Sequence, residues 1–215
     1  RILGGYPFST YLKIGDGCDN CCTYCAIPKI RGRMRSRKIE DCVEEARKLA
    51  FRGVKELVVV AQDTTAYGED IYGKPMLSEL LKELCKIEGL HWIRTLYTYP
   101  ERISDELLET IASEPKLVNY LDIPIQHVNA DILKRMNRQG SYETLSKLID
   151  RIRAKIPDIT LRTTLITGFP GETEEQFNEL ARFVKEKRFD RLGCFTYSAE
   201  EGTVAAEFPD QIDEQ

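Results

Sequence analysis

Short apolar runs alternate with amphipathic stretches along almost the whole of this 215-residue chain. The apolar runs are rich in β-branched residues and bounded by turn-forming or charged residues, a pattern that predicts strands. Six strands are expected, over residues 11–14, 57–61, 93–97, 120–125, 161–167 and 191–197.

The stretches between these runs repeat apolar residues every three or four positions, which is the spacing of one helix face. Helices are predicted around residues 39–50, 77–85, 107–112, 145–152 and 177–184. Ser104 precedes the third of them as a plausible N-cap. Thr173 and Gln176 form a capping box for the fifth, which makes its start the best marked.

Strands that alternate with helices build parallel sheets through right-handed crossovers. Six such units predict an α/β fold, a partial (β/α)6 TIM-like barrel with parallel strands, and a doubly wound open sheet is the alternative. Both folds carry function at the carboxyl ends of their strands. The loops beginning near Cys18, Gln62, Thr98, Gln126 and Gly168 are therefore expected to meet at one site.

The two ends of the chain differ from its middle. We expect residues 11–198 to form the core domain. Residues 1–10 lack periodicity and are interpreted as a linker remnant, whereas residues 199–215 are acidic and polar and are expected to lead to an absent domain.

Composition restricts the setting of the protein. The chain is 42% hydrophobic but has no run of eighteen apolar residues and no secretory leader, so a cytoplasmic protein without a membrane partner is expected. Its 31 basic and 35 acidic residues give a formal net charge of −4, which provides no bulk attraction to nucleic acid. Partners must be inferred from individual sites.

Four of the seven cysteines crowd into eight residues, at Cys18, Cys21, Cys22 and Cys25. Because a reducing compartment disfavours disulfides, this crowding indicates metal or redox chemistry. Three thiolates from one loop can hold three corners of a four-iron cluster and leave the fourth iron open for a substrate. A zinc site that includes Cys21 and a buried helical stripe are the alternatives.

The three remaining cysteines are scattered. Cys42 and Cys85 fall on predicted helix stripes, and Cys194 falls in a predicted strand. Each is interpreted as a small apolar residue of the core.

The spacing of Cys18, Cys22, Tyr24 and Cys25 resembles the Cys-x-x-x-Cys-x-aromatic-Cys signature of the radical S-adenosylmethionine (SAM) superfamily. The resemblance implies that the three cysteines bind one [4Fe-4S] cluster, with Cys21 a variable position. SAM would chelate the open iron and be cleaved by one electron to a 5′-deoxyadenosyl radical. Tyr24 is expected near the adenine.

Segments at residues 31–32, 36–37, 62–68, 121–127 and 164–173 resemble the methylthiotransferase branch of that superfamily. Its members modify either tRNA adenosine or the β-carbon of an aspartate in the twelfth protein of the small ribosomal subunit. Asp63 and His127 are similar to the ribosomal-protein group, since tRNA-modifying relatives usually carry Asn and Ser there. The resemblance implies a ribosomal protein substrate and a reductase or flavodoxin-type electron donor. A tRNA methylthiotransferase and a non-catalytic iron–sulfur or zinc module are the alternatives.

The same resemblance assigns roles at the end of the second strand. Gln62, Asp63 and Thr64 are expected near the methionine end of SAM. An Asx turn is the structural alternative for Asp63.

Roles carried over to the later strands have structural alternatives as well. Gln126 and Arg162 are expected near the carboxylate or ribose of SAM, and Ile166 with Gly168 along its adenine. Arg162 could instead be a surface cation, and Gly168 could belong to a simple strand-to-helix turn. His127 is expected to be structural, and no catalytic acid or base is assigned.

Relatives in this branch carry a preceding domain whose three cysteines hold an auxiliary cluster for sulfur delivery. Residues 1–17 contain no cysteine, so that auxiliary [4Fe-4S] cluster is expected only in an absent N-terminal domain. We therefore expect the isolated chain not to complete methylthiolation. Arg31, Arg33 and Arg35 are candidates for binding the acidic target, with a solvated basic face as the alternative.

Overall fold

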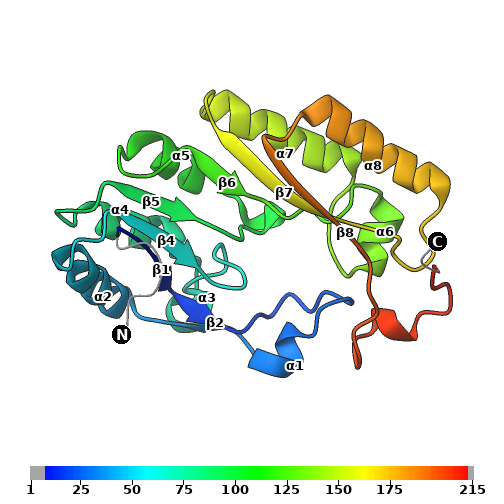
Figure 1. Cartoon of the computed structure of the whole chain (residues 1–215), viewed down its shortest axis with the longest axis horizontal. Coiled ribbons are helices and arrows are strands. Elements are labelled where there is room, and N and C mark those ends of the chain that lie inside the picture. Colours follow the sequence, from blue (N-terminus) through cyan, green and yellow to red (C-terminus); the bar gives the residue numbers. More distant parts are fainter. Residues whose placement is uncertain (1–7, 213–215) are drawn as a thin grey trace.

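The framework of the protein is a pair of three-stranded parallel sheets (Figure 1), seen in a computed structural model that describes residues 8–212. The strands pair in the orders β1-β4-β5 and β6-β7-β8. They are β1 (Ser9–Lys13), β4 (Glu56–Val60), β5 (Trp92–Thr95), β6 (Tyr120–Asp122), β7 (Thr160–Thr167) and β8 (Arg191–Thr196). All six predicted strands are confirmed, with ends shifted by a few residues.

The two sheets meet between β5 and β6. A parallel bridge joins Ile93 to Leu117, and the Thr98 amide donates to the Asp122 carbonyl at 2.9 Å. The six strands thus follow one another in chain order around a curved surface, and no pairing among the described residues joins β1 to β8. This is the predicted partial barrel, left open, and the doubly wound alternative is wrong because the strand order never reverses.

Five longer helices cover the outer side of the strands (Figure 1). They are α2 (Ile39–Phe51), α4 (Leu77–Cys85), α5 (Asp105–Ser113), α7 (Tyr142–Lys155) and α8 (Glu174–Lys187). Ser104 accepts from the Leu107 amide, and Thr173 and Gln176 form the reciprocal capping box, so both predicted helix starts are confirmed.

Several short elements in the connections carry no periodic signal and were not expected. They are β2 (Gly15–Asp16), α1 (Ile27–Arg31), β3 (Arg35–Ser36), α3 (Glu69–Tyr72), α6 (Ala130–Arg135) and the 3-10 turns η1 (Pro100–Arg102) and η2 (Ala205–Glu207). β2 and β3 pair antiparallel and close the cysteine-containing loop at its base. None of the helices within residues 8–212 is long and apolar enough to cross a membrane.

One main hydrophobic core lies between the strands and the helices, with Leu80, Leu84 and Leu121 fully buried in it. Cys42 and Cys85 belong to this core, as expected. The same expectation for Cys194 is wrong, because β8 is an edge strand and leaves its side chains exposed.

The structure describes part of each of the two expected end segments, residues 1–10 and 199–215. Strand β1 begins at Ser9, inside the predicted linker 1–10, whereas residues 1–7 of that linker and 213–215 of the predicted tail lie outside the described residues. The described part of the tail packs on the protein: Ala205 is fully buried, and its amide donates to the Thr23 carbonyl in the cysteine loop at 2.9 Å.

Candidate functional site

The cysteine loop leaves the end of β2 through a tight turn that requires glycine. Gly17 has φ 78°, and a Cβ there would lie 2.1 Å from the Arg33 carbonyl oxygen. This close approach lets the Cys18 amide donate to the Gly32 carbonyl at 3.1 Å. The loop is therefore anchored to the β2–β3 hairpin at its first cysteine.

Cys18, Cys22 and Cys25 line a single pocket of about 260 Å³, and all are free thiols. Cys21 is exposed, has φ 51° and does not line this pocket. The structure thus brings together the three cysteines of the predicted ligand set and separates the fourth. We refer to this cavity as the cysteine pocket.

The loops that follow the strands converge on the cysteine pocket almost as expected. Gln62, Thr98 and Gln126 line it beside the cysteines, together with Thr164 of β7. Gly168 does not line it; its φ is 69° and open space lies where a Cβ would be. Four of the five expected loops therefore meet directly at the pocket. The fifth begins at Gly168, farther along the chain than Thr164, and does not reach the pocket.

The adenine side of the predicted site is apolar. Tyr24 lines the cysteine pocket and packs with Ile166 against a small cluster that contains the fully buried Phe169. Phe169 stands edge-on to Tyr197, with ring centroids 5.3 Å apart. Tyr24 and Ile166, both expected beside the adenine, therefore pack against one cluster, although Ile166 does not itself line the pocket.

Two glutamines in the pocket wall have buried oxygens without partners. The Oε1 atoms of Gln62 and Gln126 are buried, and neither has a hydrogen bond partner in the structure. Gln126 also has φ 67°, a conformation that non-glycine residues rarely adopt. Since buried polar atoms are nearly always hydrogen-bonded, these acceptors fit a ligand that carries N–H or O–H donors.

A buried arginine, which the sequence did not single out, completes the wall. Arg138 is 7% exposed, its guanidinium lies 4.2 Å from the centre of the Tyr99 ring, and Nη2 donates to the Pro124 carbonyl at 2.9 Å. Its Nε atom is buried without a partner. A guanidinium held this way is suited to binding a carboxylate in the pocket.

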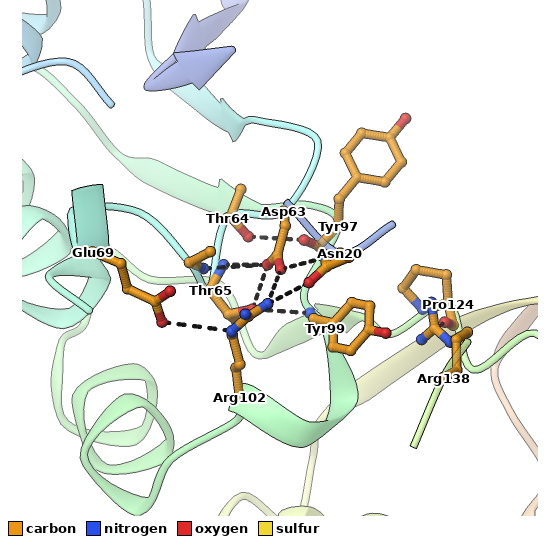
Figure 2. Close-up of polar contacts among 11 residues, drawn as sticks. Asn20, Asp63, Thr64, Thr65, Glu69, Tyr97, Tyr99, Arg102, Pro124 and Arg138 are labelled. Atoms are coloured by element: carbon orange, nitrogen blue, oxygen red, sulfur yellow. Dashed lines mark hydrogen bonds and ion pairs between the residues drawn. The ribbon is translucent and has the colours of Figure 1, made fainter. Parts of the chain in front are cut away.

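Figure 2 shows where this arginine lies relative to the strand ends: Arg138 and Pro124 stand beside Tyr99, at one side of a denser network around Asp63. Arg138 belongs to the loop after α6 and follows no family motif quoted above. Its only local signal is a basic residue in a loop between two helices, which many surface arginines share.

Burial disfavours the thiolate form of two pocket cysteines. It raises the pKa of Cys18 and of Cys25, so each favours its neutral form in the absence of a positive ligand. A metal centre displaces the proton and supplies the compensating charge. Burial raises the pKa of the core thiols further, to about 11 for Cys42 and about 12 for Cys85.

The spacing of the donors distinguishes a cluster from a single ion. Within residues 8–212, no three Cys, His, Asp or Glu side chains stand close enough together to bind one metal ion. Each thiolate of a four-iron cluster binds a different iron, so its ligands need only surround a common volume. Three thiols around one pocket fit that requirement better than they fit a zinc site.

Asp63 occupies the centre of the neighbouring polar network (Figure 2). It is 2% exposed, and Oδ1 accepts from the Thr65 amide, the Thr65 hydroxyl and the Ala66 amide. Oδ2 accepts from Asn20 Nδ2 at 2.8 Å and from Arg102 Nη1 at 2.7 Å. The Asx turn is therefore present, and the same carboxylate also ties the cysteine loop to η1.

This network, which we call the Asp63 clamp, faces a different cavity. Asp63 and Arg102 line a pocket of about 420 Å³ that shares only Cys18 and Asn20 with the cysteine pocket. Thr64 is fully buried, and its hydroxyl donates to the Leu96 carbonyl at 2.9 Å. Both residues thus have protein partners here, and their expected contact with SAM stays a prediction.

Arg162 lies deeper in the barrel than expected. It precedes Thr164 by two residues on the same face of β7, farther from the carboxyl end, and does not line the cysteine pocket. Its Nη1 is 3.8 Å from Asp122 Oδ2, while Asp122 Oδ1 is buried without a partner. Arg138 is therefore the cation that the structure places at the pocket.

His127 has the contacts of a structural residue. It is fully buried, its Nδ1 accepts from the Asn129 amide at 3.0 Å, and its Nε2 lies 3.3 Å from Glu172 Oε1. Because Nδ1 is an acceptor, Nε2 carries the proton and donates to Glu172. Glu172 Oε2 accepts in turn from the Phe169 amide, which fixes the turn after β7.

Comparison with known proteins agrees with the site. The model of the radical SAM superfamily matches residues 12–184. RimO, the ribosomal protein uS12 methylthiotransferase, is 57% identical over 212 residues in Alkaliphilus oremlandii and 57% identical over 215 residues in Clostridioides difficile. The matches cover 99% and 100% of this chain but 48% of each relative, so the chain spans about half the length of the curated relatives it matches.

Solved structures share the fold at low sequence identity. The radical SAM methyltransferase TsrM from Kitasatospora setae has a TM-score of 0.70 at 16% identity, covering 86% of this chain and 36% of TsrM. Coproporphyrinogen III oxidase (HemN) from Escherichia coli, a radical SAM enzyme, has a TM-score of 0.68 at 23% identity, covering 96% of this chain and 48% of HemN. With a family match over most of the chain, an open parallel barrel and three cysteines around one pocket, the chain belongs to the radical SAM superfamily.

Proposed function

We propose that this chain is the SAM-cleaving core of a methylthiotransferase that modifies the β-carbon of an aspartate in ribosomal protein uS12. The observation that carries the proposal is its 54–58% identity to RimO relatives over nearly its whole length. The cysteine pocket supports it, because that match includes a loop able to hold the cluster that SAM cleavage needs.

Cys18, Cys22 and Cys25 would hold three irons of one [4Fe-4S] cluster and leave the fourth iron without a cysteine ligand. When bound, the cluster and SAM together supply reductive cleavage of SAM to a 5′-deoxyadenosyl radical. The protein supplies the geometry. The Cys18 backbone is fixed by its hydrogen bond to Gly32, and the Thr23 amide donates to the Met136 carbonyl at 3.1 Å.

The pocket wall supplies complementary groups for the amino acid part of SAM. The free Oε1 atoms of Gln62 and Gln126 can accept from an ammonium group, and the Arg138 guanidinium can donate to a carboxylate. These partners would satisfy all three unpartnered sites at once. These contacts would orient SAM beside the cluster.

The apolar side of the pocket would receive the adenine. Tyr24 lines the pocket on this side, Ile166 packs against the same small apolar cluster as Tyr24, and Gly168 leaves open space where a Cβ would be. Packing of these groups around the nucleoside would hold it in place and exclude solvent from the pocket. The auxiliary cluster for sulfur delivery remains a prediction for the part of the relatives outside the match.

Two measurements test the proposal. First, the chain is reconstituted anaerobically with iron and sulfide, and SAM is added with dithionite. We expect a four-iron spectrum that changes with SAM, and formation of 5′-deoxyadenosine; stoichiometric zinc without iron would refute SAM cleavage.

Second, the matched segment of Clostridioides difficile RimO is replaced by this chain, and the hybrid is incubated with uS12 and with tRNA. Mass spectrometry should detect one methylthio group on an aspartate of uS12. A methylthio group on tRNA adenosine alone would refute the choice of substrate while leaving SAM cleavage intact.

A further inference from the structure

The segment just beyond the cysteine loop is the most basic part of the chain. Residues 29–38 contain six Lys or Arg and no acidic residue, although the chain as a whole has a net charge of −4. Five of these cations are exposed, namely Lys29, Arg31, Arg33, Arg35 and Lys38. We call them the basic surface.

Local acids neutralise only part of this surface. Arg31 and Arg33 each pair with an aspartate, Asp16 and Asp19, at 3.3 Å. No ion pair is found within residues 8–212 for the other three cations; Lys29 donates to the Gly202 carbonyl, and Arg35 to the Arg31 carbonyl. The surface therefore keeps a net positive field, and its two aspartate pairs are weak because they are exposed.

The basic surface lies against the cysteine loop but outside its pocket. Helix α1 begins two residues after Cys25, and Gly32 accepts from the Cys18 amide at 3.1 Å. None of the five cations lines the cysteine pocket. Figure 1 shows α1 at the rim of the molecule, beyond the edges of both sheets. A partner on this rim would be close to the cluster without blocking the entry of SAM.

The chemistry of the surface favours a folded acidic protein over RNA. Ile30, in the middle of the cations, is 72% exposed, and residues 29–38 contain no aromatic side chain. Single-stranded RNA is usually bound by aromatic side chains that stack on its bases. An exposed aliphatic residue among arginines is instead suited to a protein interface, where Arg is enriched and opposite charges speed encounter.

We propose that the basic surface is the docking site of an acidic one-electron carrier protein, such as a reduced flavodoxin. The inference rests on the proposed function, because only SAM cleavage gives this chain a need for an electron. One electron leaves the carrier's anionic flavin hydroquinone, which becomes the neutral semiquinone without losing a proton. The same electron reduces the [4Fe-4S] cluster from the 2+ to the 1+ state.

The first test measures binding without any cluster. Titration calorimetry compares a flavodoxin with the unmodified chain, with the Arg35→Glu/Lys38→Glu variant and with an Arg47→Glu/Lys185→Glu control. The control reverses two exposed cations on α2 and α8, so its change in net charge is identical. We expect the surface variant to bind at least about tenfold more weakly at low salt and the control to stay within about twofold.

The second test measures electron delivery in the reconstituted chain. With reduced flavodoxin, the surface variant should form 5′-deoxyadenosine about tenfold more slowly than the control, and added salt should reduce the difference. With dithionite, and with no uS12 present, all three proteins should cleave SAM at similar rates, since Arg35 and Lys38 line neither pocket.

The outcomes separate the two proposals. Failure of the unmodified chain to form 5′-deoxyadenosine with dithionite would refute the proposed function itself. Normal dithionite activity with equal flavodoxin binding by the surface variant and the control would overturn the docking site alone. Tight binding of a ribosomal RNA fragment through the basic surface, with no binding of flavodoxin, would also overturn it in favour of a nucleic acid partner.

Discussion

The Asp63 clamp and the cysteine pocket are adjacent polar regions with opposite hydrogen-bonding states. In the clamp, both carboxylate oxygens of Asp63 are engaged, by five donors at 2.5–3.2 Å. In the pocket, Gln62, Gln126 and Arg138 each have a buried atom without a partner. Cys18 and Asn20 line the cavities beside both regions.

This difference indicates that the hydrogen bonds of the clamp are completed by folding, whereas those of the pocket require a ligand. A buried atom without a partner costs about 1–3 kcal/mol, so three of them together are a substantial burden on the ligand-free protein. The Asp63 carboxylate at the centre of the clamp has no unpartnered oxygen, and its hydrogen bonds hold the cysteine loop in place. We infer that the clamp stabilises the fold. The unpartnered atoms of the pocket are instead available to form hydrogen bonds with SAM.

The largest expected effect is on the pocket. Replacing Cys22 with Ala removes one of three proposed iron ligands, and we expect the reconstituted variant to lose nearly all of its cluster. Iron and sulfide content per chain measures this. The matched control is Cys21→Ala, which should retain the cluster because Cys21 does not line the pocket. Equal cluster loss in both variants would contradict the assignment.

The next effect concerns the clamp. Arg102→Met leaves the buried Asp63 carboxylate without its charged partner, and we expect about 3 kcal/mol less stability toward unfolding by urea. A matched control is Lys155→Met, since Lys155 pairs with Glu109 at 2.7 Å on the surface and should contribute less than about 1 kcal/mol. A loss no larger for Arg102→Met than for the control would show that the clamp is dispensable.

Loss of a polar group from the pocket should not lower the stability of the ligand-free protein, in contrast to the loss expected in the clamp. Gln62→Met replaces an amide whose buried oxygen has no partner by an apolar chain of similar shape, so the ligand-free protein should be unchanged or up to about 1 kcal/mol more stable. SAM should bind about tenfold more weakly to the reconstituted variant, as measured by equilibrium dialysis. If the variant were less stable than the unmodified protein without ligand, Gln62 would contribute to the stability of the fold, as Asp63 does, and the proposed difference between pocket and clamp would be wrong.

The architecture was accessible from sequence because its signals are local. Apolar periodicity located the six strands and five longer helices, and the capping box at Thr173 fixed a helix start to the residue. The cysteine spacing located the pocket for the same reason. Cys194 was misjudged because a strand's apolar pattern does not say whether a helix covers it, and β8 lies at an edge.

The rest of the site was not accessible because its contacts join distant parts of the chain. Asn20 and Arg102 reach Asp63 across 43 and 39 residues, and Arg138 reaches Tyr24 across 114. Nothing in the neighbouring sequence marks a residue for such a contact. Asp63 was weighed as either a functional group or an Asx turn, whereas the folded chain uses its two oxygens for separate tasks.

The smallest expected effect applies one chemical change to both regions. In the clamp, the Thr65 hydroxyl donates to Asp63 Oδ1 at 2.5 Å and accepts from the Tyr99 amide at 3.1 Å, so Thr65→Val should cost about 1–2 kcal/mol. Thr164 lines the cysteine pocket, and its hydroxyl makes no hydrogen bond within residues 8–212, so Thr164→Val should change stability by less than about 0.5 kcal/mol. Urea unfolding of the two ligand-free variants provides the comparison. The two substitutions are identical in size and polarity. Equal losses in the free energy of unfolding would therefore mean that the hydrogen bonds of the clamp do not make it more stable than the pocket.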